Sequence, residues 1–412
     1  MVSEVFVATR SDRKSGVYTW TPIVLAMLFA GEAQGFGRFS YSLILPPLLK
    51  TSLHSVFLTG TLGTINVGAY LAGSIFVTWK SKRISGVRFI RMGLVTSVVG
   101  LALFGLSESF PFFSLAMALM GFGGAMIWIS SPALAAAAVA ERRKGWAIGL
   151  VGAGIGVAIT IEAQVAKVFV HLHGTLEWKA LLFAEAGVGL LITLAAFIFL
   201  HDTPKAETAS SLSQTSLFDG ESGTLPKRNI LFAAYMAYGF VQAIFLTYIV
   251  TALNHDHHYA ATTSQSIFSL VGFISIFGGV LSGRWSDPSR DRGTVMFFSF
   301  IGMGLAGVAV VSGSLPFVIV GSFLYGFGMS GVPNLVAAYI GDFSKGALFA
   351  RTFAMVTLFF GITQAIGPQI GSAIASASGS FTIDFVIVVV VSSIGAILAL
   401  LIRPKKLNPV DL

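Results

Sequence analysis

The chain has 412 residues, of which 55% are hydrophobic and only 11% are charged. A soluble domain carries about 25% charged residues, so this composition excludes an ordinary soluble protein. The net charge of +8 raises the possibility of a nucleic-acid partner, which depends on where the charges lie. The chain has no cysteine, which excludes disulfides and thiolate metal sites.

The first 20 residues are predicted to be a cytoplasmic tail. They lack the order of a signal peptide, in which a basic head precedes an apolar middle and a cleavage site. Arg10, Arg13 and Lys14 instead precede a long apolar run, as in a tail that leads into a first transmembrane helix.

Twelve apolar runs follow, each close to the roughly 20 residues that a helix needs to cross a bilayer. Only helices and closed barrels satisfy their backbone groups in lipid, and runs without alternation predict helices. We therefore expect an all-α membrane protein with twelve transmembrane helices. The expected spans are residues 21–45, 56–79, 89–107, 111–139, 146–170, 180–200, 229–253, 264–283, 294–312, 316–340, 352–376 and 381–402.

The longest polar stretch separates the sixth span from the seventh and is rich in Ser, Thr, Gly and Pro, which predicts a flexible linker. The two halves also resemble each other weakly, as in GFGG at 121–124 and GFGM at 326–329. Such symmetry favours parallel repeats with a site at their interface, although glycine-rich helices can also match by chance. The expected divisions are an N-terminal tail at 1–20, a six-helix bundle at 21–200, a cytoplasmic linker at 201–228, a pseudo-symmetric six-helix bundle at 229–402 and a C-terminal tail at 403–412.

The basic residues predict the orientation. Of the 26 Lys and Arg residues, all but Arg38, Lys50, Lys167 and Lys179 fall on segments that share one side of the membrane with the N-terminus. By the positive-inside rule both termini are then cytoplasmic, and the protein is a multi-pass protein of the cytoplasmic (inner) membrane. The basic excess orients the protein in its membrane, so no nucleic-acid partner is expected.

The loop after the eighth span reads GRWSDPSRDRG over residues 283–293. It resembles the short cytoplasmic loop motif of the major facilitator superfamily, and the resemblance extends over essentially the whole chain. In the first-half copy Ser81 stands where the acidic residue belongs. Two further stretches, GFGRFSYSLILP at 35–46 and NVGAYLAG at 66–73, resemble the YbfB/YjiJ-type branch of this superfamily.

This resemblance implies the major facilitator fold and a secondary transporter that works by alternating access. It implies no particular substrate. Met117 stands where many proton-coupled relatives carry an arginine, so coupling by that route is not expected. The resemblance also implies a cytoplasmic gate formed by Gly283, Arg284, Asp287 and Arg292, to which Arg351 is added because it begins the eleventh span.

Three charged residues within spans are candidates for function, because ionised groups are costly in hydrocarbon. Counted along their helices, Arg38 and Glu162 lie at depths of roughly 25 Å and roughly 24 Å. One interpretation is that Arg38 binds a substrate carboxylate and pairs with Glu162 when the site is empty. The other is a permanent structural pair. Glu32 has no evident partner and is either a neutral, hydrogen-bonded group or the carrier of a coupling proton.

Neutral polar and aromatic residues complete the expected site. Gln34, Arg38 and Tyr41 share one face of the first span. For any one of the others a structural role is the commoner one, but together they describe a moderately polar cavity. These further substrate-binding candidates are Asn66, Trp128, Tyr238, Gln242, Asn334 and Gln364.

The leading hypothesis is a transporter of a small organic anion such as a carboxylate, with protons or a counter-anion as possible partners. The alternatives are an exporter of lipophilic or cationic compounds, and a receptor that kept a transporter fold. No cofactor is expected, because the glycines of the fifth span follow no strand and no phosphate-binding loop is present. The external stretch NHDHHY at 254–259 is interpreted as a solvated loop, not a metal site. A monomer embedded in lipid suffices for this mechanism.

Overall fold

The computed structural model describes residues 20–403, except 82, 107, 141–142, 201–224, 290 and 345. Most of the predicted tails at 1–20 and 403–412 and most of the predicted linker at 201–228 therefore lie outside the described residues. Within the described part of the chain, all regular secondary structure is helical. This confirms the predicted fold class.

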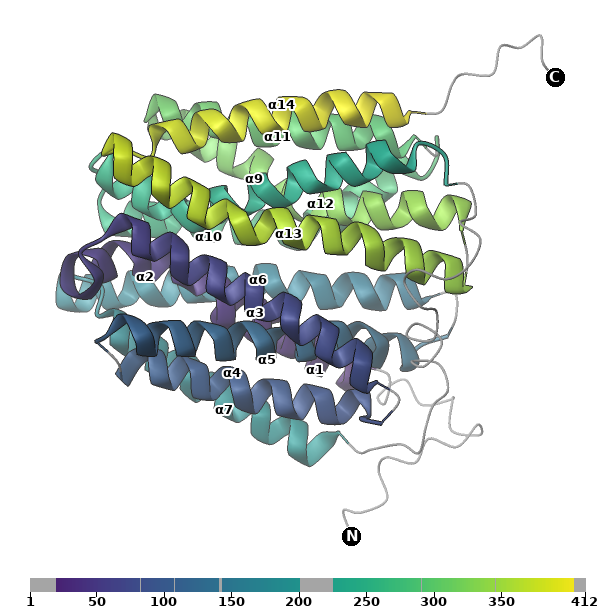
Figure 1. The fold of residues 1–412 in the computed structure, drawn as a ribbon, viewed down its shortest axis with the longest axis horizontal. Helices are drawn as coiled ribbons and strands as arrows, with labels where there is room; N and C mark the ends of the chain where they lie inside the picture. The colour runs from purple at the N-terminus through teal and green to yellow at the C-terminus, as the bar shows by residue number, and fades with distance from the viewer. Residues whose placement is uncertain are drawn as a thin grey trace.

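Each half of the chain folds into its own helical bundle, and Figure 1 shows the two bundles side by side. The first comprises α1 (Trp20–Ala30), η2 (Gly31–Phe39), α2 (Ser40–Leu48), η3 (Leu49–Leu53), α3 (Val56–Lys80), α4 (Gly86–Leu106), α5 (Phe110–Ala137), α6 (Lys144–His173) and α7 (Trp178–Phe199). The second comprises α9 (Arg228–His255), α10 (Ala261–Ser286), α11 (Arg292–Ser312), α12 (Leu315–Phe343), α13 (Gly346–Ser378) and α14 (Thr382–Ile402).

Eleven of the helices in the described residues are long and apolar enough to cross a membrane. One further crossing brings the number to twelve. It is the first in the chain and runs from α1 to η3 as several consecutive helical segments. The predicted spans match the observed helices to within a few residues, except that the first extends to Leu53 instead of residue 45.

The two ends of the bundle differ. Helix α1 begins and α14 ends at the same end, which we call the tail end, and the opposite end is the far end (Figure 1). Side chains of tryptophan gather at membrane interfaces because one edge is polar and the rest apolar. The tail end carries four exposed tryptophans in this way: Trp20, Trp79, Trp146 and Trp285.

Hydrogen bonds join the two halves in the part of the bundle towards the far end. Thr64 on α3 donates to the carbonyl of Ala365 on α13 at 2.8 Å, and the Ser372 hydroxyl of α13 donates to the carbonyl of Phe57 at 3.2 Å. On the other side of the molecule, Gln164 on α6 donates to Ser269 on α10 at 2.8 Å. These pairs hold the far end of the interface together.

Helices α6 and α10 cross closely because glycine lets their backbones approach. A Cβ atom on Gly156 would lie 2.6 Å from the carbonyl oxygen of Gly272, and one on Gly272 would lie 2.6 Å from a methyl carbon of Ile159. Gly154 likewise packs against the backbone of α1, whereas Gly149 and Gly152 have open space beside them. Of the four glycines at 149, 152, 154 and 156, two therefore serve close helix packing.

The first span contains a π-helical segment, η2, in which the backbone N–H of Ser40 bonds to the carbonyl of Gly35, five residues earlier. π-Helical turns are rare, and they widen the backbone and free some of its carbonyls. Here the Asn66 side chain donates to the carbonyl of Gly37 at 3.1 Å. Gly31 and Gly35 allow the widened segment to lie against α6 near Ala158.

Candidate functional site

A small cavity lies between the two halves, with a volume of about 30 Å³. That is room for one or two water molecules, so a larger solute needs the walls to move apart. The first half contributes η2, α2, α3 and α5 to the lining, and the second half contributes α9 and α13. Five of the nine predicted substrate-binding residues line it: Arg38, Tyr41, Asn66, Gln242 and Gln364.

Arg38 is the charged residue of this cavity lining. Its guanidinium donates a long hydrogen bond of 3.5 Å to Gln34 and lies 5.5 Å from the ring centre of Phe39. Within the described part of the chain Arg38 forms no ion pair. A guanidinium carries five donors, so most of its hydrogen-bonding capacity is available to a bound anion.

Two of the predicted ligands, Asn66 and Tyr41, already donate their side-chain hydrogens to backbone carbonyls of the protein. Both amide hydrogens of Asn66 are used, one on the carbonyl of Gly37 and one on that of Met117, each at 3.1 Å. The Tyr41 hydroxyl donates to the carbonyl of Thr59 at 2.9 Å. Asn66 and Tyr41 therefore shape the cavity next to Arg38 and offer a solute little more than their remaining acceptor lone pairs.

The second half places an amide pair in the cavity wall. The side-chain nitrogen of Gln364 on α13 donates to the side-chain oxygen of Gln242 on α9 at 2.6 Å. This bond leaves the nitrogen of Gln242 and the oxygen of Gln364 as a donor and an acceptor. The wall contributed by the second half is thus polar and uncharged.

The other four predicted ligands lie outside the cavity lining. Gln34 is buried beside Arg38, and the Tyr238 hydroxyl donates to the carbonyl of Met329. Trp128 packs against an apolar cluster of α1 and α6. Asn334 donates to the carbonyl of Gly279 at 2.5 Å, towards the tail end. Their roles as substrate ligands stay predictions.

The predicted ion pair between Arg38 and Glu162 is not formed among the described residues. Glu162 lies on the side of η2 next to Gly35, where its Oε2 would be 3.6 Å from a Cβ atom on that glycine. Its charged neighbour is Glu185 of α7, which is also buried. The depth estimate placed Arg38 and Glu162 at one level but could not give the direction of each side chain around its helix.

Glu32 is buried inside the first bundle and does not line the cavity. Its carboxyl group lies near Gly189 on α7, and Ser97 on α4 is its polar neighbour. Neither of its side-chain oxygens has a hydrogen-bond partner among the described residues. Both interpretations of Glu32 from the sequence stay predictions.

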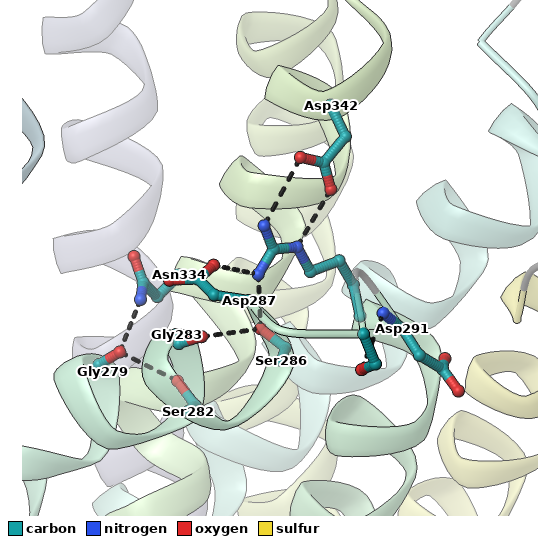
Figure 2. A network of polar contacts seen from close by, with 10 residues as sticks. Gly279, Ser282, Gly283, Ser286, Asp287, Asp291, Asn334 and Asp342 are labelled. Carbon is teal, nitrogen blue, oxygen red and sulfur yellow. Dashed lines mark hydrogen bonds and ion pairs between the residues drawn. The ribbon is translucent and has the colours of Figure 1, made fainter.

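A second polar cluster lies at the tail end of the second half, where α10, α11 and α12 meet (Figure 2). The buried guanidinium of Arg292 donates to Asp287 at 2.5 Å and to Ser286 at 2.6 Å. On its other side it forms an ion pair with Asp342 at 3.0 Å. We call Arg292, Asp287, Ser286 and Asp342 the Arg292 cluster.

The Arg292 cluster brings together two of the five predicted gate residues, Asp287 and Arg292. Gly283 lies next to Asn334, which bonds to α10 at Gly279. Arg284 is exposed and Arg351 partly buried. Asp342 was not among the predicted gate residues, and its one signal in the sequence is an acidic residue at the end of an apolar span.

A membrane-embedded bundle of two six-crossing halves, with a cation in a cavity between them, is the architecture of a multi-pass transporter. A family model described as "Uncharacterised MFS-type transporter YbfB" matches residues 30–403. The chain therefore belongs to this family of transporters, within the major facilitator superfamily (MFS), as the sequence motifs predicted.

Other comparisons agree with this assignment. The "Uncharacterized MFS-type transporter YfiU" of Bacillus subtilis (strain 168) is 26% identical over 147 residues, which are 36% of this chain and 27% of that relative. The match thus spans about a quarter of the relative's length. A crystal structure of a bacterial homologue of the human lysosomal transporter Spinster, in an inward-facing and unoccupied conformation, has a TM-score of 0.74. It covers 95% of this chain and 100% of its own at 14% identity, which shows a shared fold.

Proposed function

We propose that the protein is a secondary active transporter of the cytoplasmic membrane that moves a small organic anion, a carboxylate, by alternating access. The observation that carries this proposal is Arg38, which lines the cavity between the halves and forms no ion pair with a described residue. A guanidinium that forms no ion pair within the protein is a favourable partner for an anion, and its planar fork matches a carboxylate.

The opposite wall supports the same substrate class. Gln242 and Gln364 supply one amide donor and one acceptor but no charge. A solute that places a carboxylate on Arg38 can therefore bond a neutral polar group to this pair. An organic anion with one acidic end and an uncharged polar part fits both walls.

The distribution of basic residues supports an orientation with the tail end in the cytoplasm. The hydrogen bonds between the halves that lie towards the far end then close the external side of the site. A bundle closed at the external side corresponds to an inward-facing conformation, and we infer this state, which is the one named for the Spinster homologue of similar fold. Rocking of the two halves about the cavity would open the far end.

Two other functions have weaker support. An exporter of cations would need an acidic group at the solute site, but Glu32 and Glu162 do not line the cavity. A receptor without flux would keep the binding site and lose transport. A flux assay separates this last alternative from the proposal.

The test is a thermal-shift screen of the purified protein against carboxylates, amino acids, sugars and cationic drugs. We expect a carboxylate to raise the unfolding temperature, and Arg38→Lys to weaken that effect, because an ammonium cannot form the two parallel bonds of a guanidinium. The matched control is Arg228→Lys at an exposed position. Stabilisation by cations that is indifferent to Arg38→Lys would overturn the proposal.

A further inference from the structure

A pair of acidic side chains lies inside the first bundle, away from the central cavity. Glu162 on α6 is 1% exposed and Glu185 on α7 is 4% exposed. Both lie against one turn of η2, because Glu162 is next to Gly35, Glu185 is next to Ser40, and the Ser40 N–H bonds to the Gly35 carbonyl. The hydroxyl of Ser40, at the junction of η2 and α2, lies 2.7 Å and 2.8 Å from the two carboxyl oxygens of Glu185. Neither oxygen of Glu162 has a hydrogen-bond partner among the described residues.

Basic groups on the elements around this pair are directed elsewhere. Lys179 on α7 is 2.5 Å from Glu108. Lys167 follows Glu162 by five residues on α6 and therefore projects from a different face of that helix. On η2, Arg38 bonds to Gln34. The pair thus forms no ion pair with a cation in the described part of the chain.

The remaining titratable groups on the surrounding elements do not neutralise it either. Lys144, His171 and His173 lie at the two ends of α6, away from Glu162 in its middle. Glu32 on η2 is acidic and lies against α4 and α7, near Ser97 and Gly189. Tyr41 on α2 donates its hydroxyl hydrogen to the carbonyl of Thr59. Helices α1 and α5 present no charged residue, and α10 carries its one charged side chain, Arg284, near the tail end.

Two buried carboxylates without a cation repel each other and lose their hydration, so a state in which both are ionised is strongly unfavourable. A single added proton removes the repulsion and gives Glu162 a hydrogen to share with its neighbour. We propose that Glu162 and Glu185 form a site for one proton, with Ser40 as the hydrogen-bond donor to the carboxyl group that keeps its charge.

Ser40 contacts the acidic pair and also lies near Arg38. A second small cavity, of about 10 Å³, touches both Ser40 and Arg38, and a single water molecule fills such a volume. Ser40 is two residues from Arg38, so a change in the charge of the pair acts on the backbone that carries Arg38. The binding of this proton does not depend on the proposed solute. A coupling of proton binding to solute transport, in contrast, rests on the transport function proposed above.

The test is a pH titration of the carboxyl C=O bands of the purified full-length protein by infrared spectroscopy. Two groups that share a site release their protons in two separate steps. We expect Glu162→Gln and Glu185→Gln each to remove one of the two steps, and Ser40→Ala to move the first deprotonation to higher pH. Glu177→Gln, at an exposed position next to α7, is the matched control and should keep both steps.

Glu32 and Asp384 are also buried carboxyl groups, so the contribution of the pair is the difference between the wild-type spectrum and that of each variant. The proposal is overturned if both glutamine variants titrate like Glu177→Gln. It is equally overturned if the bands follow the concentration of NaCl at constant pH, which would indicate a sodium site. The titration needs no solute, so a failure of carboxylate binding at Arg38 leaves its outcome unaffected.

Discussion

Asn66 on α3 donates a hydrogen bond of 3.1 Å to the carbonyl of Gly37, within the π-helical part of the first span. Its second amide hydrogen goes to the carbonyl of Met117 on α5. One side chain thus satisfies a carbonyl of the irregular segment and ties it to two neighbouring helices. Gly37 is adjacent to Arg38, so Asn66 also determines where the cation of the cavity lies.

Replacing Asn66 with leucine should destabilise the protein by about 2 kcal/mol or more, because two buried carbonyls lose their donor at a cost of about 1–3 kcal/mol each. Leucine has a similar volume, so little of the loss would come from a cavity. The measurement is thermal unfolding in detergent. The same variant should weaken carboxylate stabilisation, since Arg38 would no longer be held in position.

Asn229→Leu, at an exposed position on α9, is the control for a general effect of removing an asparagine. An Asn66→Leu protein as stable as the wild type would mean that η2 does not depend on this side chain.

The sequence predicted the helices well because the bilayer sets their length and the apolar runs are long. The predicted 56–79 and the observed Val56–Lys80 differ by one residue. Hydropathy could not reveal that the first span contains a π-helix. The π-helix is accommodated by the packing of its glycines against α6 and by the hydrogen bond from Asn66. These are contacts between segments distant in the sequence.

The candidate site was predicted only in part, because contacts between distant segments decide which polar side chains meet. Arg38, Gln242 and Gln364 were recognised as polar residues in apolar spans, and they line the cavity. Pairing Arg38 with Glu162 required the direction of each side chain, which depends on the backbone geometry of η2. Glu185 could not be assigned to Glu162 from the sequence because their helices meet only in the folded bundle.

Gly35→Ala should destabilise the protein by about 1–3 kcal/mol, the usual cost of overpacking. The new Cβ atom would collide with the Cβ atom of Ala158 on α6. Adding Ala158→Gly should recover most of the loss because it removes the opposing methyl group. Thermal unfolding of the single and double variants measures this coupling.

Gly152→Ala serves as the matched control, because a Cβ atom at Gly152 on α6 has open space around it. This variant should be as stable as the wild type or slightly more stable, since alanine has the higher helix propensity. Equal losses for Gly35→Ala and Gly152→Ala would argue that backbone preference, not contact with Ala158, decides the effect.

In the Arg292 cluster, Asp342→Asn should cost more stability than Asp287→Asn. Both oxygens of Asp342 accept hydrogen bonds from Arg292, at 3.0 Å and 3.4 Å, and its side chain is 27% exposed against 65% for Asp287. A less solvated partner contributes more to an ion pair. We expect the losses to differ by about 1 kcal/mol or more, since hydrogen bonds to charged groups contribute about 1.5–3 kcal/mol.

Thermal unfolding of the two variants, each also combined with Arg292→Gln, measures the coupling of each aspartate to the arginine. In the absence of Arg292 the two substitutions should become nearly equal. If Asp287→Asn is less stable than Asp342→Asn, the more exposed ion pair, between Arg292 and Asp287, contributes more to the stability of this cluster.

Asp291 should make stability depend on pH in the acid range. It caps α11 by accepting hydrogen bonds from the backbone and hydroxyl groups of Thr294, and Arg403 pairs with it at 3.2 Å. Partial burial alone would raise the pKa of Asp291, but these hydrogen bonds and the charge of Arg403 hold it below its ordinary value. Its contribution is therefore fully present above the unfolded pKa of about 3.9 and is lost as the pH falls through the lower folded value.

Asp291→Asn keeps an oxygen for the cap but removes the attraction to Arg403, so it should cost about 0.2–1 kcal/mol at neutral pH. Asp291→Ala removes the cap as well and should cost about 1 kcal/mol more. The two variants separate the contributions because the gap between the wild type and Asp291→Asn should close in acid, where the carboxyl group is protonated. Unfolding temperatures measured from neutral to acid pH provide the test, and a gap that stays constant would show that the charge of Asp291 does not stabilise this end of α11.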